Sequence, residues 1–206
     1  MSDTAADFIL RRNNEENTPI PKGRMIFVRH GSTSMNSDGD RIRGWKDIPL
    51  DKEGIEEANN VAKKIPPVDC IYSSSLQRAS DTAETISKHQ GGTKLVLTED
   101  LKPWDLGIFT GSHSAQIQDK IRYYVEHPEV EVPKGESFDT FRKRFLTFII
   151  NLKRDYPVGR IAVVSHYRGD RLLGAWEAAG SKPDMSVDRE VFLTKGKLEP
   201  GQMRSF

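Results

Sequence analysis

The stretch Met25-Ile26-Phe27-Val28-Arg29-His30-Gly31-Ser32-Thr33 decides the fold of this chain. Its apolar run predicts a buried strand of an α/β sheet, and the glycine and serine after His30 predict a turn at the carboxyl end of that strand. Sheets of this class bind their ligands at that edge. His30 is therefore a candidate nucleophile, because a neutral imidazole carries a lone pair near pH 7, and Arg29 is placed to hold an anionic group. A loop histidine beside a solvated arginine is the competing interpretation.

Composition narrows the class of protein. The chain has 206 residues, enough for one sizeable core, and its 31 Lys and Arg against 30 Asp and Glu leave a net charge of +1. We therefore expect neither nucleic acid nor a membrane surface as a partner. The single cysteine, Cys70, favours a reducing compartment, and the sequence shows no 18-residue apolar span and no hydrophobic signal core. We expect a cytoplasmic protein.

The chain divides into two parts. Residues 1–23 are predicted to form a polar N-terminal extension, because residues 11–17 are almost entirely charged or amide and two prolines follow. An arm that recruits a partner is the alternative to an extension without catalytic role. Residues 24–206 are predicted to form a single domain.

Strand and helix patterns alternate through that domain. Besides the first strand, apolar runs predict strands within 68–73, 95–97 and 161–166. Apolar residues at helical spacing predict helices within 51–65, 76–86, 117–125, 138–152 and 172–179, with Asp51 and Ser137 as N-caps. This alternation predicts βαβ units and a mainly parallel sheet.

Further polar residues are expected at the same edge of the sheet. The strand at 161–166 ends in His166, as the first strand ends in His30, so both histidines should face one edge. Arg78 lies at the start of a predicted helix, where a cation is electrostatically unfavourable, which favours a role in binding an anion. Asn36 and Arg43 in the polar segment 34–49 suit an anion pocket, or else an exposed basic loop.

Five blocks of the sequence resemble the signature blocks of the histidine phosphatase superfamily, which has the phosphoglycerate mutase-like fold. They occur in the family's order and cover roughly residues 24–180. The blocks are Val28–Asn36, Arg41–Asp47, Tyr72–Ala79, Gly135–Ser137 and Val163–His166.

The resemblance implies a three-layer αβα sandwich and a set of site residues. His30 would attack a phosphoryl group and become phosphohistidine, and His166 would take part in catalysis. The residues that would hold the phosphoryl oxygens are Arg29, Asn36, Arg78 and His166, and those at the substrate mouth are Arg43, Gly44 and Tyr167. The resemblance implies no metal and no cofactor, and the sequence contains no nucleotide-type phosphate loop or metal-ligand spacing.

Two departures from the family pattern concern the acid and the substrate mouth. The family's general acid is usually a glutamate, but Pro103 stands at that position in Leu101–Gly107, and Asp105 is predicted to replace it. Tyr167 follows His166 where glycine is common in the family. It would either shape the substrate mouth or make a structural contact.

Three functions follow from these observations. We expect a metal-independent phosphatase that hydrolyses a small phosphomonoester through a phosphohistidine on His30. The alternatives are a phosphoglycerate mutase-type phosphotransferase and a non-catalytic protein that binds a phosphorylated ligand. The chain is short beside the mutases, which have additional segments that enclose the substrate, and this favours hydrolysis.

Overall fold

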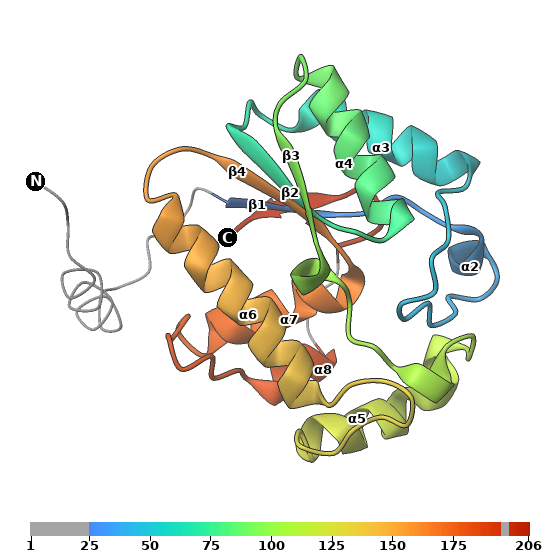
Figure 1. Cartoon of the computed structure of the whole chain (residues 1–206). Helices are drawn as coiled ribbons and strands as arrows, with labels where there is room; N and C mark the ends of the chain where they lie inside the picture. The colour runs from blue at the N-terminus through green and yellow to red at the C-terminus, as the bar shows by residue number, and fades with distance from the viewer. Residues whose placement is uncertain (1–24, 195–197) are drawn as a thin grey trace, which may run out of the picture.

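A five-stranded sheet forms the centre of the molecule in a computed structural model that describes residues 25–194 and 198–206. The predicted extension at 1–23 lies outside these residues. The strand order is β3-β2-β4-β1-β5, and all neighbours are parallel except β1 and β5 (Figure 1). The strands are β1 (Met25–Arg29), β2 (Cys70–Ser74), β3 (Leu95–Thr98), β4 (Ile161–Ser165) and β5 (Met203–Ser205).

Helices cover both faces of this sheet (Figure 1). The helices α3 (Lys52–Lys64) and α4 (Gln77–His89) pack on one face, and α6 (Phe138–Asp155), α7 (Tyr167–Ala178) and α8 (Arg189–Thr194) lie on the other. The prediction of a three-layer αβα sandwich with a mainly parallel sheet is confirmed. No helix in the described part of the chain is long and apolar enough to cross a membrane.

The sequence of β1 explains its burial on both faces. Met25 and Phe27 belong to the core beneath α6 and α7, whereas Ile26 and Val28 belong to the core beneath α3 and α4. Successive side chains of a strand point to opposite faces, so a continuous apolar run is what a central strand requires.

Local capping agrees with the sequence at two helices. The Asp51 carboxylate accepts a hydrogen bond from the Gly54 amide at the start of α3, and the Ser137 hydroxyl accepts one from the Thr140 amide at the start of α6. Ile55 belongs to the apolar pattern that predicts the helix within 51–65, yet it is 52% exposed. The backbone of α3 approaches the backbone of Ser32 closely at Gly54, where a Cβ atom would lie 2.0 Å from the Ser32 carbonyl oxygen. Gly54, and not Ile55, therefore faces this contact.

Several short elements complete the fold. The helical ones are α2 (Ser34–Ser37), α5 (Gln118–Glu126) and three 3₁₀ turns, Glu99–Leu101, Gly107–Phe109 and Ser114–Ile117. The sequence pattern did not predict β5, which pairs antiparallel with β1 and places Arg204 opposite Phe27. Its three residues are too few to show an alternation of apolar and polar side chains.

Register places the two histidines together. Arg29 of β1 is the partner of Ser165 of β4, and the His30 amide donates to the Ser165 carbonyl oxygen at 3.0 Å. Because the two strands are parallel and end at the same level, His30 and His166 leave the sheet as neighbours.

Candidate active site

His30 is held in one tautomer. Its side chain is 1% exposed, and its Nδ1 lies 2.7 Å from the Gly31 carbonyl oxygen. A carbonyl oxygen can only accept a hydrogen bond, so Nδ1 carries the ring proton and Nε2 keeps the lone pair. The local backbone therefore prepares Nε2 for nucleophilic attack.

The electrostatic environment keeps His30 neutral. Burial lowers its pKa well below the ordinary value of 6.5, and the positive charges of Arg78, Arg43 and Arg29 lower it further. Both effects disfavour the imidazolium form. The Nε2 lone pair is thus available near neutral pH.

His166 lies beside His30 at the start of α7. The two ring centroids are 4.9 Å apart, and the His166 Nε2 lies 2.8 Å from the Ser74 hydroxyl at the end of β2. Its Nδ1 is buried and has no hydrogen-bond partner in the described part of the chain. Burial and then Arg78 lower its pKa well below 6.5, so the ring is neutral and one nitrogen is free to contact a ligand.

Arg78 extends from the first turn of α4 and is 1% exposed. Its Nη1 donates to the Lys46 carbonyl oxygen at 2.9 Å and its Nη2 to the Gly44 carbonyl oxygen at 3.0 Å. Its Nε is buried and makes no hydrogen bond to any described residue. Burial and then Arg43 lower its pKa to about 9, so it remains a cation at neutral pH. A fixed guanidinium with one unused donor suits a phosphoryl oxygen.

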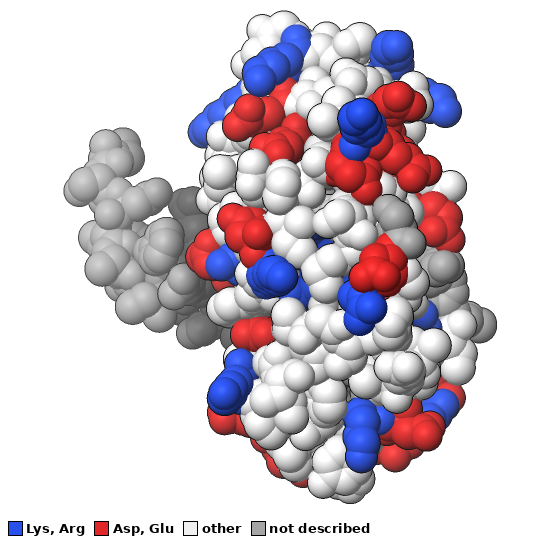
Figure 2. Space-filling model, turned by 90° about the vertical axis from the view of Figure 1, so that its right-hand side faces the viewer, with Lys and Arg blue, Asp and Glu red and all other residues white. Residues whose placement is uncertain are grey.

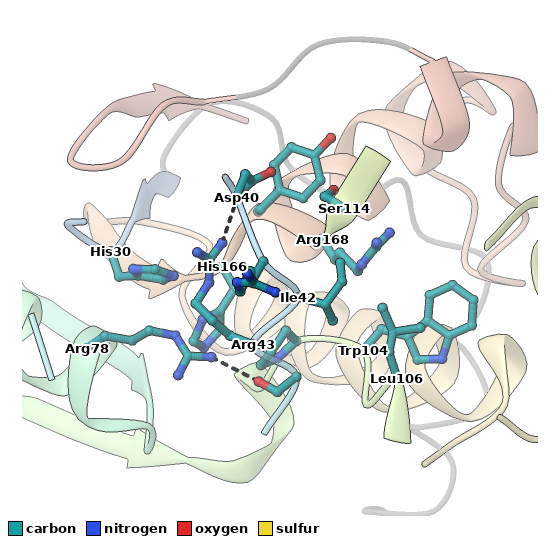
Figure 3. Close-up of a pocket in the computed structure, with 14 residues that line it drawn as sticks. His30, Asp40, Ile42, Arg43, Arg78, Trp104, Leu106, Ser114, His166 and Arg168 are labelled. Atoms are coloured by element: carbon teal, nitrogen blue, oxygen red, sulfur yellow. Dashed lines mark hydrogen bonds and ion pairs between the residues drawn. The ribbon is translucent and has the colours of Figure 1, made fainter. Parts of the chain in front are cut away.

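These three side chains line one pocket (Figure 3). Its empty volume is about 480 Å³, part of which is open to solvent. The described charged residues that line it are four arginines and one aspartate, Arg41, Arg43, Arg78, Arg168 and Asp40. The remaining lining residues are His30, Ile42, Gly44, Pro103, Trp104, Leu106, Ser114, His166 and Tyr167.

The mouth residues predicted from the sequence lie in this lining. Gly44 has φ 49°, and a Cβ atom there would lie 2.7 Å from the Thr110 hydroxyl, so both backbone and space require glycine. Arg43 has one buried Nη1 without a described partner, and its Nη2 lies 3.5 Å from the Asp40 carboxylate. The Tyr167 ring packs beneath the Arg29 guanidinium at 5.2 Å.

Arg29 and Asn36 line an adjoining hollow rather than this pocket. The Arg29 Nη1 donates to the Leu198 carbonyl oxygen at 2.7 Å, and the Asn36 Oδ1 accepts from the Thr33 amide at 3.0 Å. Asp40 and Tyr167 line both hollows. Binding of a phosphoryl oxygen by Arg29 and Asn36 therefore stays a prediction.

Asp105 is not among the residues that line the pocket. Its Oδ1 accepts from the Gly107 amide at 3.1 Å, and this oxygen would lie 3.7 Å from a Cβ atom on Gly44. The carboxylate thus sits behind Gly44 and caps a tight turn in which Gly107 has φ 43°. Its role as the general acid stays a prediction, and Asp40 is the described aspartate that lines the pocket.

Asp40 and Ser114 are polar lining residues that were not identified from the sequence. Asp40 has φ 49° and ends the Asp38-Gly39-Asp40 segment, which is itself a turn signal. Ser114 comes from a distant loop that an isolated bridge between Arg41 and His113 brings to the pocket. Only the tertiary fold shows that the two lie at one site.

No group of three or more His, Cys, Asp or Glu side chains is placed to hold a metal ion within residues 25–194 and 198–206. The cations in the pocket are arginines, which bind anions directly.

Comparisons with known proteins identify relatives of this chain. A metal-independent phosphoserine phosphatase of Arabidopsis thaliana is 30% identical over 152 residues, which are 69% of this chain and 63% of that relative; the chain thus matches less than two thirds of its length. Phosphoglycerate mutase-like protein 4 of Arabidopsis thaliana is 30% identical over 71% of this chain and 67% of that protein.

A solved structure is also similar. A mutant phosphoserine phosphatase of Entamoeba histolytica in complex with phosphoserine is 28% identical, with a TM-score of 0.68 over 88% of this chain and 89% of that one. The model of the histidine phosphatase superfamily, branch 1, matches residues 25–179. The chain belongs to the histidine phosphatase superfamily.

Proposed function

We propose that this protein is a metal-independent phosphatase that hydrolyses a phosphomonoester through a phosphohistidine on His30. The observation that carries the proposal is the fixed tautomer of His30, with an unprotonated Nε2 in a pocket lined by arginines. Phosphoryl transfer needs an aligned nucleophile and positive charge around the transferring group more than it needs further covalent chemistry.

In the first step the His30 Nε2 forms a bond to phosphorus, and the bond from phosphorus to the leaving oxygen breaks. The leaving oxygen takes the electron pair. The Arg78 Nε, the Arg43 Nη1 and the His166 Nδ1 are buried nitrogens without described partners, and they would contact the phosphoryl oxygens. Charge that develops on these oxygens is stabilised by donors already in place. Arg29 and Asn36 are proposed to add to this set from the adjoining hollow.

In the second step a water oxygen forms a bond to phosphorus, and the bond to His30 Nε2 breaks. The electron pair returns to Nε2, one hydrogen of the water stays on the oxygen that is now bound to phosphorus, the other passes to solvent, and inorganic phosphate leaves. The pocket opens to solvent, which supplies the water.

The class of substrate is proposed from the relatives and the surface. Two similar proteins are named phosphoserine phosphatases, and phosphoserine is a small phosphorylated molecule. We propose a substrate of that kind. Figure 2 shows acidic and basic side chains interspersed over one face, which offers no broad basic surface there for nucleic acid.

Cys70 is buried and unpaired, and we propose the cytoplasm as the location of the protein.

Phosphate release tests the proposed function. The wild-type protein, incubated with p-nitrophenyl phosphate and excess EDTA, should release inorganic phosphate steadily over many turnovers. Binding of the ester without release would support a non-catalytic ligand-binding protein. Isomerisation of a phosphoglycerate that requires a bisphosphate primer, with no net phosphate release, would support the mutase-type phosphotransferase.

A comparison of leaving groups tests the predicted acid. If Asp105 is the general acid, Asp105→Asn should slow an alkyl phosphate by about 10²-fold or more and an aryl phosphate far less, since only an alkoxide needs a proton as it leaves. Equal losses for both substrates would instead assign Asp105 to the turn in which its carboxylate accepts from the Gly107 amide. Asp40→Asn, measured in parallel, applies the same criterion to the aspartate that lines the pocket.

A further inference from the structure

We propose that Arg168 binds a second anionic group of the substrate, at the end of the pocket opposite His30. The preferred substrates are then phosphomonoesters that carry a further negative charge on the leaving group, such as a carboxylate. This inference rests on the proposed function for the position of the phosphoryl group.

Arg168 differs from the other arginines around it. Arg144 donates to the Glu136 carboxylate and to backbone carbonyls, and Arg171 donates to the Phe192 carbonyl oxygen. The Arg168 guanidinium has no hydrogen bond or ion pair to any residue in 25–194 and 198–206, and it packs over the Trp104 ring, 5.9 Å from the ring centroid. Arg168 is half-buried and lines the pocket.

The position of Arg168 is electrostatically unfavourable without an anion. It is the second residue of α7, at the helix end that repels cations. Arg43 and Arg171 also repel its charge, whereas Asp40 is the carboxylate near enough to attract it. Burial lowers its pKa to about 10, so it stays charged at neutral pH.

Two of the arginines that line the pocket have no carboxylate partner among the described residues. Arg41 pairs with Asp38 and Arg43 lies 3.5 Å from the Asp40 carboxylate, whereas Arg78 and Arg168 form no ion pair with a described residue. The phosphoryl group is proposed to lie at Arg78, next to His30. A second anion on the same substrate would neutralise Arg168, whose planar guanidinium suits a carboxylate in a bidentate arrangement.

The shape of the pocket separates the two anion sites. In Figure 3, His30 and Arg78 lie on one side, and Arg168 lies on the other near Trp104 and Leu106. Ile42, Trp104 and Leu106 provide apolar surface in the lining. A substrate that spans the pocket would place its phosphoryl group at His30, its carbon skeleton against this apolar surface and its second anion at Arg168.

Two aryl phosphates that differ only in charge test the proposal. We would compare kcat/KM for 4-carboxyphenyl phosphate and 4-carbamoylphenyl phosphate, whose leaving phenols are similar in size and shape. Wild-type protein should prefer the carboxylate by on the order of 10-fold or more, the effect of one charge-assisted hydrogen bond in a buried site. Equal values for the two esters would overturn the proposal, whereas absence of phosphate release from both would instead refute the proposed function.

Variants assign the preference to one side chain. Arg168→Gln should lower kcat/KM for the carboxylate ester more than for the amide ester and so abolish the preference, and Arg168→Lys should retain part of it. Arg122→Gln, which removes an exposed arginine of α5 paired with Glu190, should change neither value. A preference that persists in Arg168→Gln, in protein whose thermal unfolding is unchanged, would overturn the assignment. Equal loss for both esters would also overturn it.

Discussion

Replacing His30 by alanine is expected to abolish the phosphoenzyme and to reduce kcat by on the order of 10⁴-fold or more, as removal of a catalytic nucleophile does elsewhere. The Nε2 lone pair exists because the Gly31 carbonyl fixes the proton on Nδ1 and because burial and three arginines keep the ring neutral. No other described side chain in the pocket presents an unprotonated nitrogen in a position fixed in this way. The substitution removes the atom that would bond to phosphorus.

A covalent label measures this effect. Wild-type protein treated with a ³²P-labelled substrate should carry label that is lost in acid and stable in alkali, and His30→Ala should carry none. His89→Ala, which removes an exposed histidine at the end of α4, should keep the label. Label in the His30→Ala protein at the wild-type level would contradict the proposal. Vanadate binding by the His30→Ala protein, measured as a shift of its unfolding temperature, would show that the pocket still folds.

The sequence predicted that His30 and His166 lie together because paired parallel strands end at the same edge of a sheet. Each histidine follows an apolar strand, β1 or β4, and these two strands are paired, with Arg29 opposite Ser165. Arg78 follows from the same rule, because β2 lies next to β4 and α4 starts directly after it. The charge of Arg78 at a helix N-terminus was the signal for a role in binding an anion, and that role stays a prediction.

Other parts of the site depend on loop contacts that the sequence pattern does not show. Asp105 and Asn36 are short polar side chains, and each satisfies a nearby backbone amide, that of Gly107 and that of Thr33. Such local bonds compete with a role in a distant pocket and are decided by the turn geometry. Arg168 reaches the pocket because His166 is the N-cap of α7, so that the first turn of this helix faces the same edge as the two histidines.

Arg78→Ala should produce the second large effect, a decrease in kcat/KM of about 10²- to 10³-fold. The substitution removes the arginine whose charge lowers the pKa of both histidines most. It also leaves the Lys46 and Gly44 carbonyl oxygens without their donor. Arg78→Lys should recover only part of the loss, because an ammonium group cannot hold both carbonyls and a phosphoryl oxygen in one plane. Lys88→Ala, an exposed position of the same helix, should leave kcat/KM unchanged. A kcat/KM for Arg78→Ala within about 3-fold of wild type would contradict the role.

The pH dependence separates an electrostatic role for Arg78 from a merely structural one. In the wild type, burial and Arg78 are the two largest causes that hold the pKa of His30 and of His166 well below 6.5. Removing the guanidinium takes away a positive charge and admits water, and both changes raise these pKa values toward 6.5. Protonated His30 has no lone pair on Nε2, so the acid limb of the kcat/KM profile should move to higher pH in Arg78→Ala. A profile that is lowered at every pH without a shift would show that Arg78 acts on the phosphoryl group and loop alone, and not on the protonation of the nucleophile.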